Sequence, residues 1–370
     1  MKIAKPKFEL NSVHLAVVMS SAATAAASVF IPLLARQLGI SYADLGIVSA
    51  SFWAGAIISY YLFGWLADAT GRKSALIKVG LALSCIAFLA QFFIADFFSF
   101  TAIRFLAGFA TGIYAYSMVA AASSLPKYKK EIGLLSAFGS LGWFLGYVFA
   151  SLLGDARILF VASGAMYLVA FLASTRMASL RHVKKSLPLN PLNLLRKNKS
   201  VYLTYFLRHL GANAVWLIQP LFLQQLGASE FWIGAIMAVN VLAQFFLMKW
   251  VGQEAQKGAL DEKKLVRQGA IVAGALFALY PFIPNFYFAI AIQLMIAVSW
   301  SFMYVGSMIR LASTNSEKAA SAGLLGSVLS LSTILGAIAG GLLAQQFGML
   351  STFAFAVLLC GASFLASKEI

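Results

Sequence analysis

Charged residues are scarce in this 370-residue chain, where they make up 11% of the sequence and only 12 of them are Asp or Glu. An average soluble domain holds about 25% charged residues, so this composition excludes an ordinary water-soluble protein. Cysteine and histidine are also rare, with two and three copies. Because Cys85 and Cys360 stand alone in apolar segments far apart in the sequence, we expect no disulfide framework, no metal site and no cofactor.

Residue groups that carry out catalysis are missing as well. A nucleophile with its base, or a metal cluster, would have to lie together in the apolar part of the chain. No Asp or Glu falls near the middle of any apolar segment. No G-x-x-x-x-G-K-[ST] phosphate loop occurs either, so nothing supports direct hydrolysis of ATP. The sequence therefore predicts that the protein is not an enzyme.

Long apolar segments dominate the chain instead, with 61% apolar residues and a mean hydropathy of +0.85. A bilayer core about 30 Å thick is crossed by a helix of about 20 mainly apolar residues. Twelve segments of this kind can be placed in the sequence, at 12–35, 43–67, 74–95, 98–122, 131–153, 156–178, 201–226, 230–252, 266–284, 286–311, 319–345 and 348–367. We therefore expect an all-α membrane protein with twelve transmembrane helices.

The basic residues indicate how these segments cross the membrane. The net charge of +16 would suggest nucleic acid only if the basic residues clustered on a soluble face, so we expect no nucleic-acid partner. With the start of the chain inside, only Arg36 and Arg157 of the 28 Lys and Arg residues fall in outer loops, and Arg104 and Arg208 fall within spans. This distribution satisfies the positive-inside rule. It predicts a multi-pass protein of the cell membrane with both termini in the cytoplasm.

Two pairs of matching segments indicate an internal duplication. PLLARQLGISYADLG begins at Pro32, and PLFLQQLGASEFWIG begins 188 residues later at Pro220, with seven identical positions. GLLSAFGSLGWFLGYVFASLL from Gly133 likewise matches GLLGSVLSLSTILGAIAGGLL from Gly323, with nine identities. Colinear matches at nearly one offset predict two copies of a six-helix unit.

The duplication predicts the domain organisation. We expect an N-terminal six-helix bundle at 1–178, a basic cytoplasmic linker at 179–200, and a C-terminal six-helix bundle at 201–370. Parallel repeats of this kind are related by an axis along the membrane normal, and transporters built from them bind their solute where the repeats face each other. The expected partners are the lipid bilayer and a small-molecule substrate, and we expect a monomer.

A motif between the second and third segments, GWLADATGRK, holds Gly64, Asp68, Gly71, Arg72 and Lys73. It closely resembles the signature of the major facilitator superfamily, in which a glycine, an aspartate, a second glycine and a basic pair stand at this spacing in this loop. In that superfamily the loop acts as a latch between inward-facing and outward-facing states. The resemblance therefore implies a gating role for these five residues, and an ordinary inside-positive turn is the alternative.

The loop that matches this motif in the second half has Gln256 where Asp68 would fall. A latch of this kind would therefore be asymmetric.

Glycines in two further segments also resemble motifs of the superfamily. Arg104, Gly108 and Gly112 match its arginine-glycine motif, with Ala107 where glutamine is common. The fifth segment has the glycine spacing of the exporter-type motif but lacks its proline and its terminal glycine pair. Its glycines are Gly133, Gly142 and Gly146. They favour export, and small-residue contacts between helices are the equally weighted alternative.

Two arginines lie within the spans and are the strongest candidates for binding or coupling. A charge inside a bilayer costs about 2.5 to 3.5 kcal/mol on insertion scales and therefore suggests a function. Arg104 and Arg208 have no acidic partner near the middle of a span, which favours organic anions or zwitterions as solutes. The alternative is that each side chain extends to its nearer membrane surface. His209 points away from Arg208 by helical geometry, and we expect it only to pack.

Polar and aromatic residues at helical spacing suggest further lining of the solute cavity. Each one is more often a contact between helices than a ligand contact. The candidates are Gln219, Asn240, Gln244, Gln293, Trp300 and Tyr304.

These observations predict a secondary active transporter that works by alternating access, an efflux permease for an amphipathic or anionic compound. An uptake or exchange carrier for an organic anion or a sugar is the alternative, and a non-transporting membrane receptor is a more remote one. Because proton-driven carriers usually bury a carboxylate, the lack of one near the middle of any span leaves open whether an ion is coupled to transport.

Overall fold

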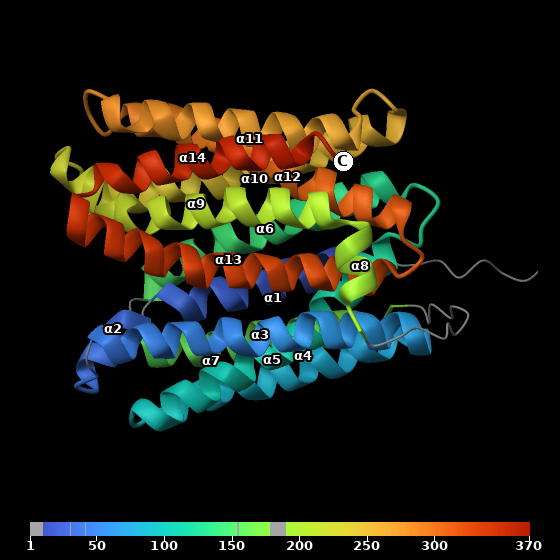
Figure 1. Ribbon diagram of the computed structural model, residues 1–370. Coiled ribbons are helices and arrows are strands. Elements are labelled where there is room, and N and C mark those ends of the chain that lie inside the picture. Colours follow the sequence, from blue (N-terminus) through green and yellow to red (C-terminus); the bar gives the residue numbers. More distant parts are fainter. Residues whose placement is uncertain (1–9, 30, 41, 154, 178–189) are drawn as a thin grey trace, which may run out of the picture. The chain divides into compact units, whose positions relative to one another are not determined.

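The computed structural model describes residues 10–29, 31–40, 42–153, 155–177 and 190–370, and these residues form helices connected by short turns (Figure 1). In sequence order the helices are α1 (Leu10–Val29), α2 (Ile31–Gln37), α3 (Tyr42–Thr70), α4 (Lys73–Ala90), η1 (Gln91–Phe93), α5 (Phe97–Ala122), α6 (Tyr128–Leu153), α7 (Ala156–Thr175), α8 (Leu192–Lys197), α9 (Lys199–Gln225), α10 (Glu230–Lys257), α11 (Glu262–Leu279), η2 (Tyr280–Phe282), α12 (Phe288–Thr314), α13 (Lys318–Phe347) and α14 (Leu350–Ser367). The described residues contain no strand, which confirms the expected all-α fold.

The chain divides into two compact units. Unit 1 comprises 1–126, 138–189 and 316–326, and unit 2 comprises 127–137, 190–315 and 327–370. The start of α6 therefore clusters with unit 2, and the start of α13 clusters with unit 1. The bundle boundaries at 178 and 201 remain a prediction, since residues 178–189 lie outside the described residues.

The two units pack their helices in the same pattern. In unit 1, α1 packs on α7, α3 packs on α5, and α4 packs on both α5 and α7. In unit 2, α9 packs on α14, α10 packs on α12, and α11 packs on both α12 and α14. Each contact in unit 1 has a counterpart in unit 2 that joins the helices at the same positions in the six-helix series, as a duplicated unit requires.

The predicted spans correspond to these helices. The expected first span, 12–35, covers α1 and most of α2, and Phe30 between them lies outside the described residues. Among the described residues, eleven helices are long and apolar enough to cross a membrane, and the long helix that is not among them is α9. Arg208, Asn213 and Gln219 lie on α9, and these polar residues lower its hydropathy.

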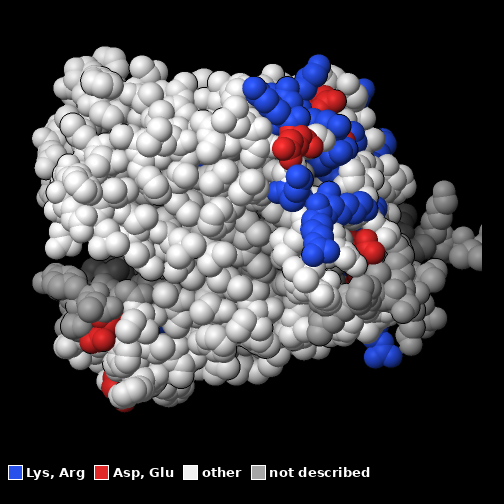
Figure 2. All heavy atoms as spheres, in the orientation of Figure 1, with Lys and Arg blue, Asp and Glu red and all other residues white. Residues whose placement is uncertain are grey.

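Side chains on the outside of the helices suit a lipid environment. Large apolar side chains such as Phe98, Leu152 and Phe282 are exposed, as expected where the surrounding solvent is hydrocarbon. In unit 2 the exposed Lys257 and Lys263 lie where α10 ends and α11 begins. Figure 2 shows most of the basic side chains on this face gathered in one group. The lengths of these helices away from that group are almost free of charge in this view.

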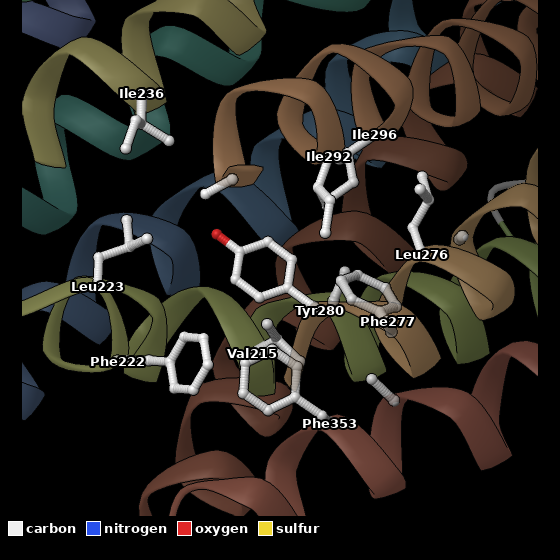
Figure 3. Close-up of a cluster of buried hydrophobic side chains, with 14 of the residues drawn as sticks. Val215, Phe222, Leu223, Ile236, Leu276, Phe277, Tyr280, Ile292, Ile296 and Phe353 are labelled. Atoms are coloured by element: carbon white, nitrogen blue, oxygen red, sulfur yellow. The ribbon is translucent and has the colours of Figure 1, made fainter. Parts of the chain in front are cut away.

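The core of unit 2 is built around Tyr280, which follows α11 in the short turn η2 (Figure 3). Its ring stacks on Phe353 of α14 at 5.4 Å, and Phe222 of α9 lies 5.9 Å away. Val215 and Ile292 complete this cluster from α9 and α12. The cluster fixes α9 relative to the other helices of unit 2, and α9 carries Arg208.

Candidate functional site

The loop of the superfamily-like motif is a tight reversal between α3 and α4. Gly71 has a φ of 67°, a left-handed conformation that glycine adopts without steric cost. α3 ends at Thr70 and α4 begins at Lys73, so the reversal takes two residues. The short loop holds Asp68 and Lys73 close together in the folded chain.

Asp68 caps the first turn of another helix. Its Oδ2 atom accepts hydrogen bonds from the backbone N–H groups of Ala319 and Ala320 at 2.8 and 2.9 Å. These N–H groups lack partners within α13, and the positive end of the helix dipole favours a carboxylate there. Both partners of this contact belong to unit 1. Asp68 thus binds the start of α13 to the end of α3.

The Lys73 side chain is buried beside Asp68. Its side chain is only 4% exposed, and its Nζ atom lies 3.9 Å from Asp68 Oδ1. Nζ also donates to the carbonyl oxygen of Ala120 at 3.4 Å and to Ser124 Oγ at 3.3 Å. The end of α5 presents carbonyl groups without helical partners, which attract a cation. Arg72 is exposed.

Glycines bring α3 and the start of α13 into close contact. A Cβ atom on Gly64 would lie 2.5 Å from the carbonyl oxygen of Ala319, and one on Gly323 would clash with the carbonyl oxygen of Tyr60. Both clashes are with backbone, which cannot give way as a flexible side chain does. A larger residue at Gly64 or Gly323 would therefore displace the helix that Asp68 caps.

Unit 2 contains the corresponding crossing, formed by α10 and the start of α6. A Cβ atom on Gly133 would lie 2.5 Å from Gly252 Cα. Gln256 occupies the position that matches Asp68, and its Oε1 atom has no hydrogen-bond partner among the described residues. An ion pair at 3.2 Å between Lys129 and Glu262, the first residue of α11, holds the start of α6 instead. The two crossings are therefore secured by different interactions.

The other glycines of the sequence motifs lie at helix contacts within unit 1. A Cβ atom on Gly108 would clash with the carbonyl oxygen of Phe52, and one on Gly112 would clash with Ser59. Cβ atoms on Gly142 and Gly146 would lie 2.5 Å from the carbonyl oxygens of Val18 and Ala22. All four therefore allow close helix packing, whatever further role they have.

Arg104 is buried in unit 1, 4% exposed, with its guanidinium 4.5 Å from the centre of the Phe52 ring. Its Nε and Nη1 atoms are buried and have no hydrogen-bond partner among the described residues. Close to it, Tyr167 forms hydrogen bonds with Thr24 at 2.7 Å and Tyr114 at 3.2 Å. Unit 1 thus contains a buried cation beside a network of hydroxyl groups.

Arg208 is buried in unit 2 and is 1% exposed, so its guanidinium does not extend to the membrane surface. Nη2 donates to Ser299 Oγ at 3.2 Å, whereas Nε and Nη1 have no partner among the described residues. The centres of the Trp300 and Trp216 rings lie 5.4 and 5.8 Å from the guanidinium, within cation–π range. This side chain is a buried cation with free donors.

The remaining candidates fall into two groups in unit 2. Asn240 donates to the carbonyl oxygen of Gln293 at 2.9 Å and accepts from Gln244 at 2.6 Å, so these three lie together. Trp300 stacks on Tyr304 at 5.6 Å, next to Arg208. Gln219 is buried, and its Nε2 atom has no partner among the described residues. Gln293 therefore lies with Asn240, and not with Trp300 and Tyr304 on its own helix.

Several neighbours of Arg208 were not singled out from the sequence. Tyr205 and Trp216 lie three residues before it and eight after it on α9, a helical spacing that could have drawn attention to them. Ser299 comes from α12, and nothing in the sequence around it indicates a contact with Arg208. His209, expected only to pack, stacks against Tyr205 at 5.9 Å and lies 5.0 Å from Trp300. It therefore belongs to the surroundings of Arg208.

The chain is similar to known transport proteins over different lengths. The "Multidrug resistance protein MdtG" of Rahnella sp. (strain Y9602) is 29% identical over 154 residues, which cover 38% of this chain and 36% of that protein. The protein of the same name from Citrobacter koseri is 29% identical over 180 residues, covering 45% and 43%. The chain thus aligns with less than half the length of these curated relatives.

A solved structure shares the fold over nearly the whole chain. The crystal structure of the human organic anion transporter MFSD10 (TETRAN) matches with a TM-score of 0.80 and covers 98% of this chain and 100% of that one, at 15% sequence identity. At that identity the likeness shows the fold alone. It confirms the expected arrangement of two pseudo-symmetric six-helix bundles.

The family itself is shown by the sequence. A family model described as Major Facilitator Superfamily matches residues 13–308, most of the chain, and it confirms the resemblance first noted at GWLADATGRK. The chain therefore belongs to the Major Facilitator Superfamily.

Proposed function

We propose that this multi-pass membrane transporter is a secondary active efflux permease of the cell membrane, which works by alternating access with both termini in the cytoplasm. The observation that carries the proposal is the capping of α13 by Asp68. Such a contact is a switch, because breaking it releases the start of α13 and making it again restores one defined arrangement. A static receptor has no need of a charged contact of this kind.

The proposed substrate is a small amphipathic or anionic compound. Arg104 and Arg208 are buried cations, and none of the ion pairs found among the described residues includes either of them. A buried charge is stable only when it is paired, and a negatively charged solute would supply the partner. The multidrug resistance proteins among the relatives also support efflux.

Transport by the purified protein in proteoliposomes tests this function. Flux of organic anions, sugars and lipophilic cations would be measured in both directions, with and without an imposed proton gradient. Saturable efflux that favours one charge class is expected. Flux that needs no gradient and never saturates would overturn the carrier mechanism.

An uptake or exchange carrier for an organic anion or a sugar is the second candidate. The two buried arginines support an anionic solute equally well, whether the protein transports it out of the cell or into it. Exchange would appear as counterflow, in which unlabelled solute on one side accelerates the entry of labelled solute from the other.

Replacing Arg104 with alanine should lower affinity for anionic solutes by about tenfold or more, since a hydrogen bond to a charged group contributes about 1.5 to 3 kcal/mol. Thermal-shift titration of the detergent-purified protein with organic anions measures this. Arg176→Ala is the matched control, because Arg176 is an exposed arginine of the same unit. Unchanged anion affinity in Arg104→Ala would show that this arginine is structural.

A further inference from the structure

Buried polar atoms without partners gather on one stretch of α9 in unit 2. Tyr205 Oη, Arg208 Nε and Nη1, and His209 Nδ1 are all buried and lack a hydrogen-bond partner among the described residues. The three residues stand three and four positions apart, so they lie on neighbouring turns of the helix. Most buried polar groups in proteins form hydrogen bonds. A buried group without a hydrogen-bond partner therefore needs an explanation, such as a missing ligand.

The protein groups around Arg208 cannot neutralise its charge. Ser299 Oγ donates its own proton to the carbonyl oxygen of Gly269 at 2.7 Å and accepts from Arg208 at 3.2 Å. It is therefore fully used and uncharged. The guanidinium also faces the rings of Trp216 and Trp300, which attract a cation but carry no charge. The Cys360 thiol and the Tyr205 hydroxyl group are close enough to interact with it as well. None of these neutral groups supplies the anion that a buried cation requires.

His209 does not add a second positive charge in this arrangement. Thr333 Oγ1 donates its proton to the carbonyl oxygen of Leu329 at 2.9 Å, so towards His209 Nε2, at 3.4 Å, it can only accept. Nε2 therefore carries the proton of a neutral ring, and Nδ1 is left as a bare acceptor. A protonated ring would add one more buried donor without a partner. This group of side chains thus carries one positive charge.

The walls around this charge are aromatic and flat. Trp300 lies 5.0 Å from His209 and 5.8 Å from Tyr205, and it stacks on Tyr304 with an angle of 16° between the rings. Trp216 and Trp300 are partly exposed, whereas the free donors of Arg208 are fully buried. A solute would reach the donors when one of these two indole side chains turns aside. A planar aromatic ring of the solute would then stack in the place that the indole had left.

On the basis of the proposed transport function, we propose that Arg208, Tyr205, Trp216 and Trp300 form the subsite for a planar aromatic monocarboxylate. The carboxylate accepts a hydrogen bond from one free edge of the Arg208 guanidinium, at Nε or at Nη1, and another from the Tyr205 hydroxyl group. The aromatic ring of the solute stacks on the indole ring that stays in place, because Trp216 and Trp300 themselves meet edge to face at 6.3 Å and leave no gap for a third ring. The single charge of the site selects a monoanion, and the flat walls select an aromatic one.

Isothermal titration of the full chain in lipid nanodiscs with 1-naphthoate tests this subsite without requiring transport. Cyclohexanecarboxylate and 1-naphthalenemethanol separate the two contributions, because the first lacks the planar ring and the second lacks the charge. We expect 1-naphthoate to bind about tenfold or more tightly than either. Equal binding of the alcohol would overturn the role of the arginine, and equal binding of the aliphatic acid would overturn the role of the rings.

Arg208→Gln should remove the preference for 1-naphthoate over the alcohol. Arg267→Gln removes the same charge from an exposed site in the same unit and should keep the preference. Trp300→Leu should weaken 1-naphthoate binding more than cyclohexanecarboxylate binding. If Arg208→Gln binds 1-naphthoate as the unmodified protein does, the proposal is wrong.

Thermal stability without solute separates a binding arginine from a structural one. Because Arg208 has no charged partner, Arg208→Gln should melt at the same temperature as the unmodified protein or higher. A lower melting temperature in Arg208→Gln than in Arg267→Gln would show that Arg208 is structural and would overturn the proposal. Binding of 1-naphthoate without flux in proteoliposomes would contradict the transporter function but support the subsite. Flux of other solutes without binding of 1-naphthoate would support the transporter function but contradict the subsite.

Discussion

Asp68→Asn should slow turnover by about tenfold or more while substrate affinity changes by less than about twofold, because an interaction that acts in switching affects rate and not ground-state binding. Asparagine can still accept the hydrogen bonds from Ala319 and Ala320, but it lacks the charge that faces the start of α13. It also leaves buried Lys73 without the carboxylate 3.9 Å away. The comparison is between initial transport rate in proteoliposomes and affinity from thermal-shift titration.

Asp261→Asn is the matched control for this substitution. Asp261 also caps a helix with its carboxylate, accepting from the backbone N–H groups of Lys263 and Lys264 at 2.8 and 3.1 Å. The bond from Lys264, followed by that from Lys263, lowers the pKa of Asp261, so it too is ionised at neutral pH. It is exposed and caps only the helix that follows it. Equal loss of rate in both variants, or loss of affinity in Asp68→Asn, would contradict the gating role.

Gly252→Val should strongly reduce both transport and thermal stability. A Cβ atom at this position would lie 2.6 Å from Gly133 Cα and 3.0 Å from the carbonyl oxygen of Lys129. Both atoms belong to the backbone of α6, so the start of that helix must move away. Forcing extra atoms into a packed contact costs about 1 to 3 kcal/mol, and in this case it also separates Lys129 from Glu262. Melting temperature and initial transport rate measure the two effects.

Gly234→Val provides the control on the same helix. Gly234 has no atom within 4 Å of the place where its Cβ would be, so the same substitution there creates no contact. It should leave both melting temperature and transport rate close to those of the unmodified protein. If the two variants behave alike, the loss arises from valine in α10 and not from the crossing with α6.

The helices could be predicted from the sequence because apolar length in a bilayer permits few alternatives. The spans at 98–122 and 156–178 begin within one residue of α5 and α7, since Asp96 and Asp155 cap these helices and mark where they start.

The residues of the candidate site could be proposed from the sequence more readily than the contacts that they make. Spacing along α10 placed Asn240 and Gln244 together, because residues four apart share a helix face, and they are hydrogen bonded. The same spacing could not show that Lys73 turns inward to Asp68, since a basic residue at the end of a span is usually exposed. Nor could it bring Ser299 to Arg208, because that contact depends on how α9 and α12 pack in space.

The polarity of α9 bears on how the protein is made. During synthesis each helix leaves the translocation machinery and partitions into lipid, and a charged residue near its centre raises the free energy of that step by about 2.5 to 3.5 kcal/mol. α9 contains Arg208, and among the described residues it is the long helix that is not apolar enough to cross a membrane by composition alone. It packs mainly on α14, which begins at Leu350. The helix that holds the proposed substrate arginine therefore reaches its stable position late, only after more than a hundred further residues have been translated.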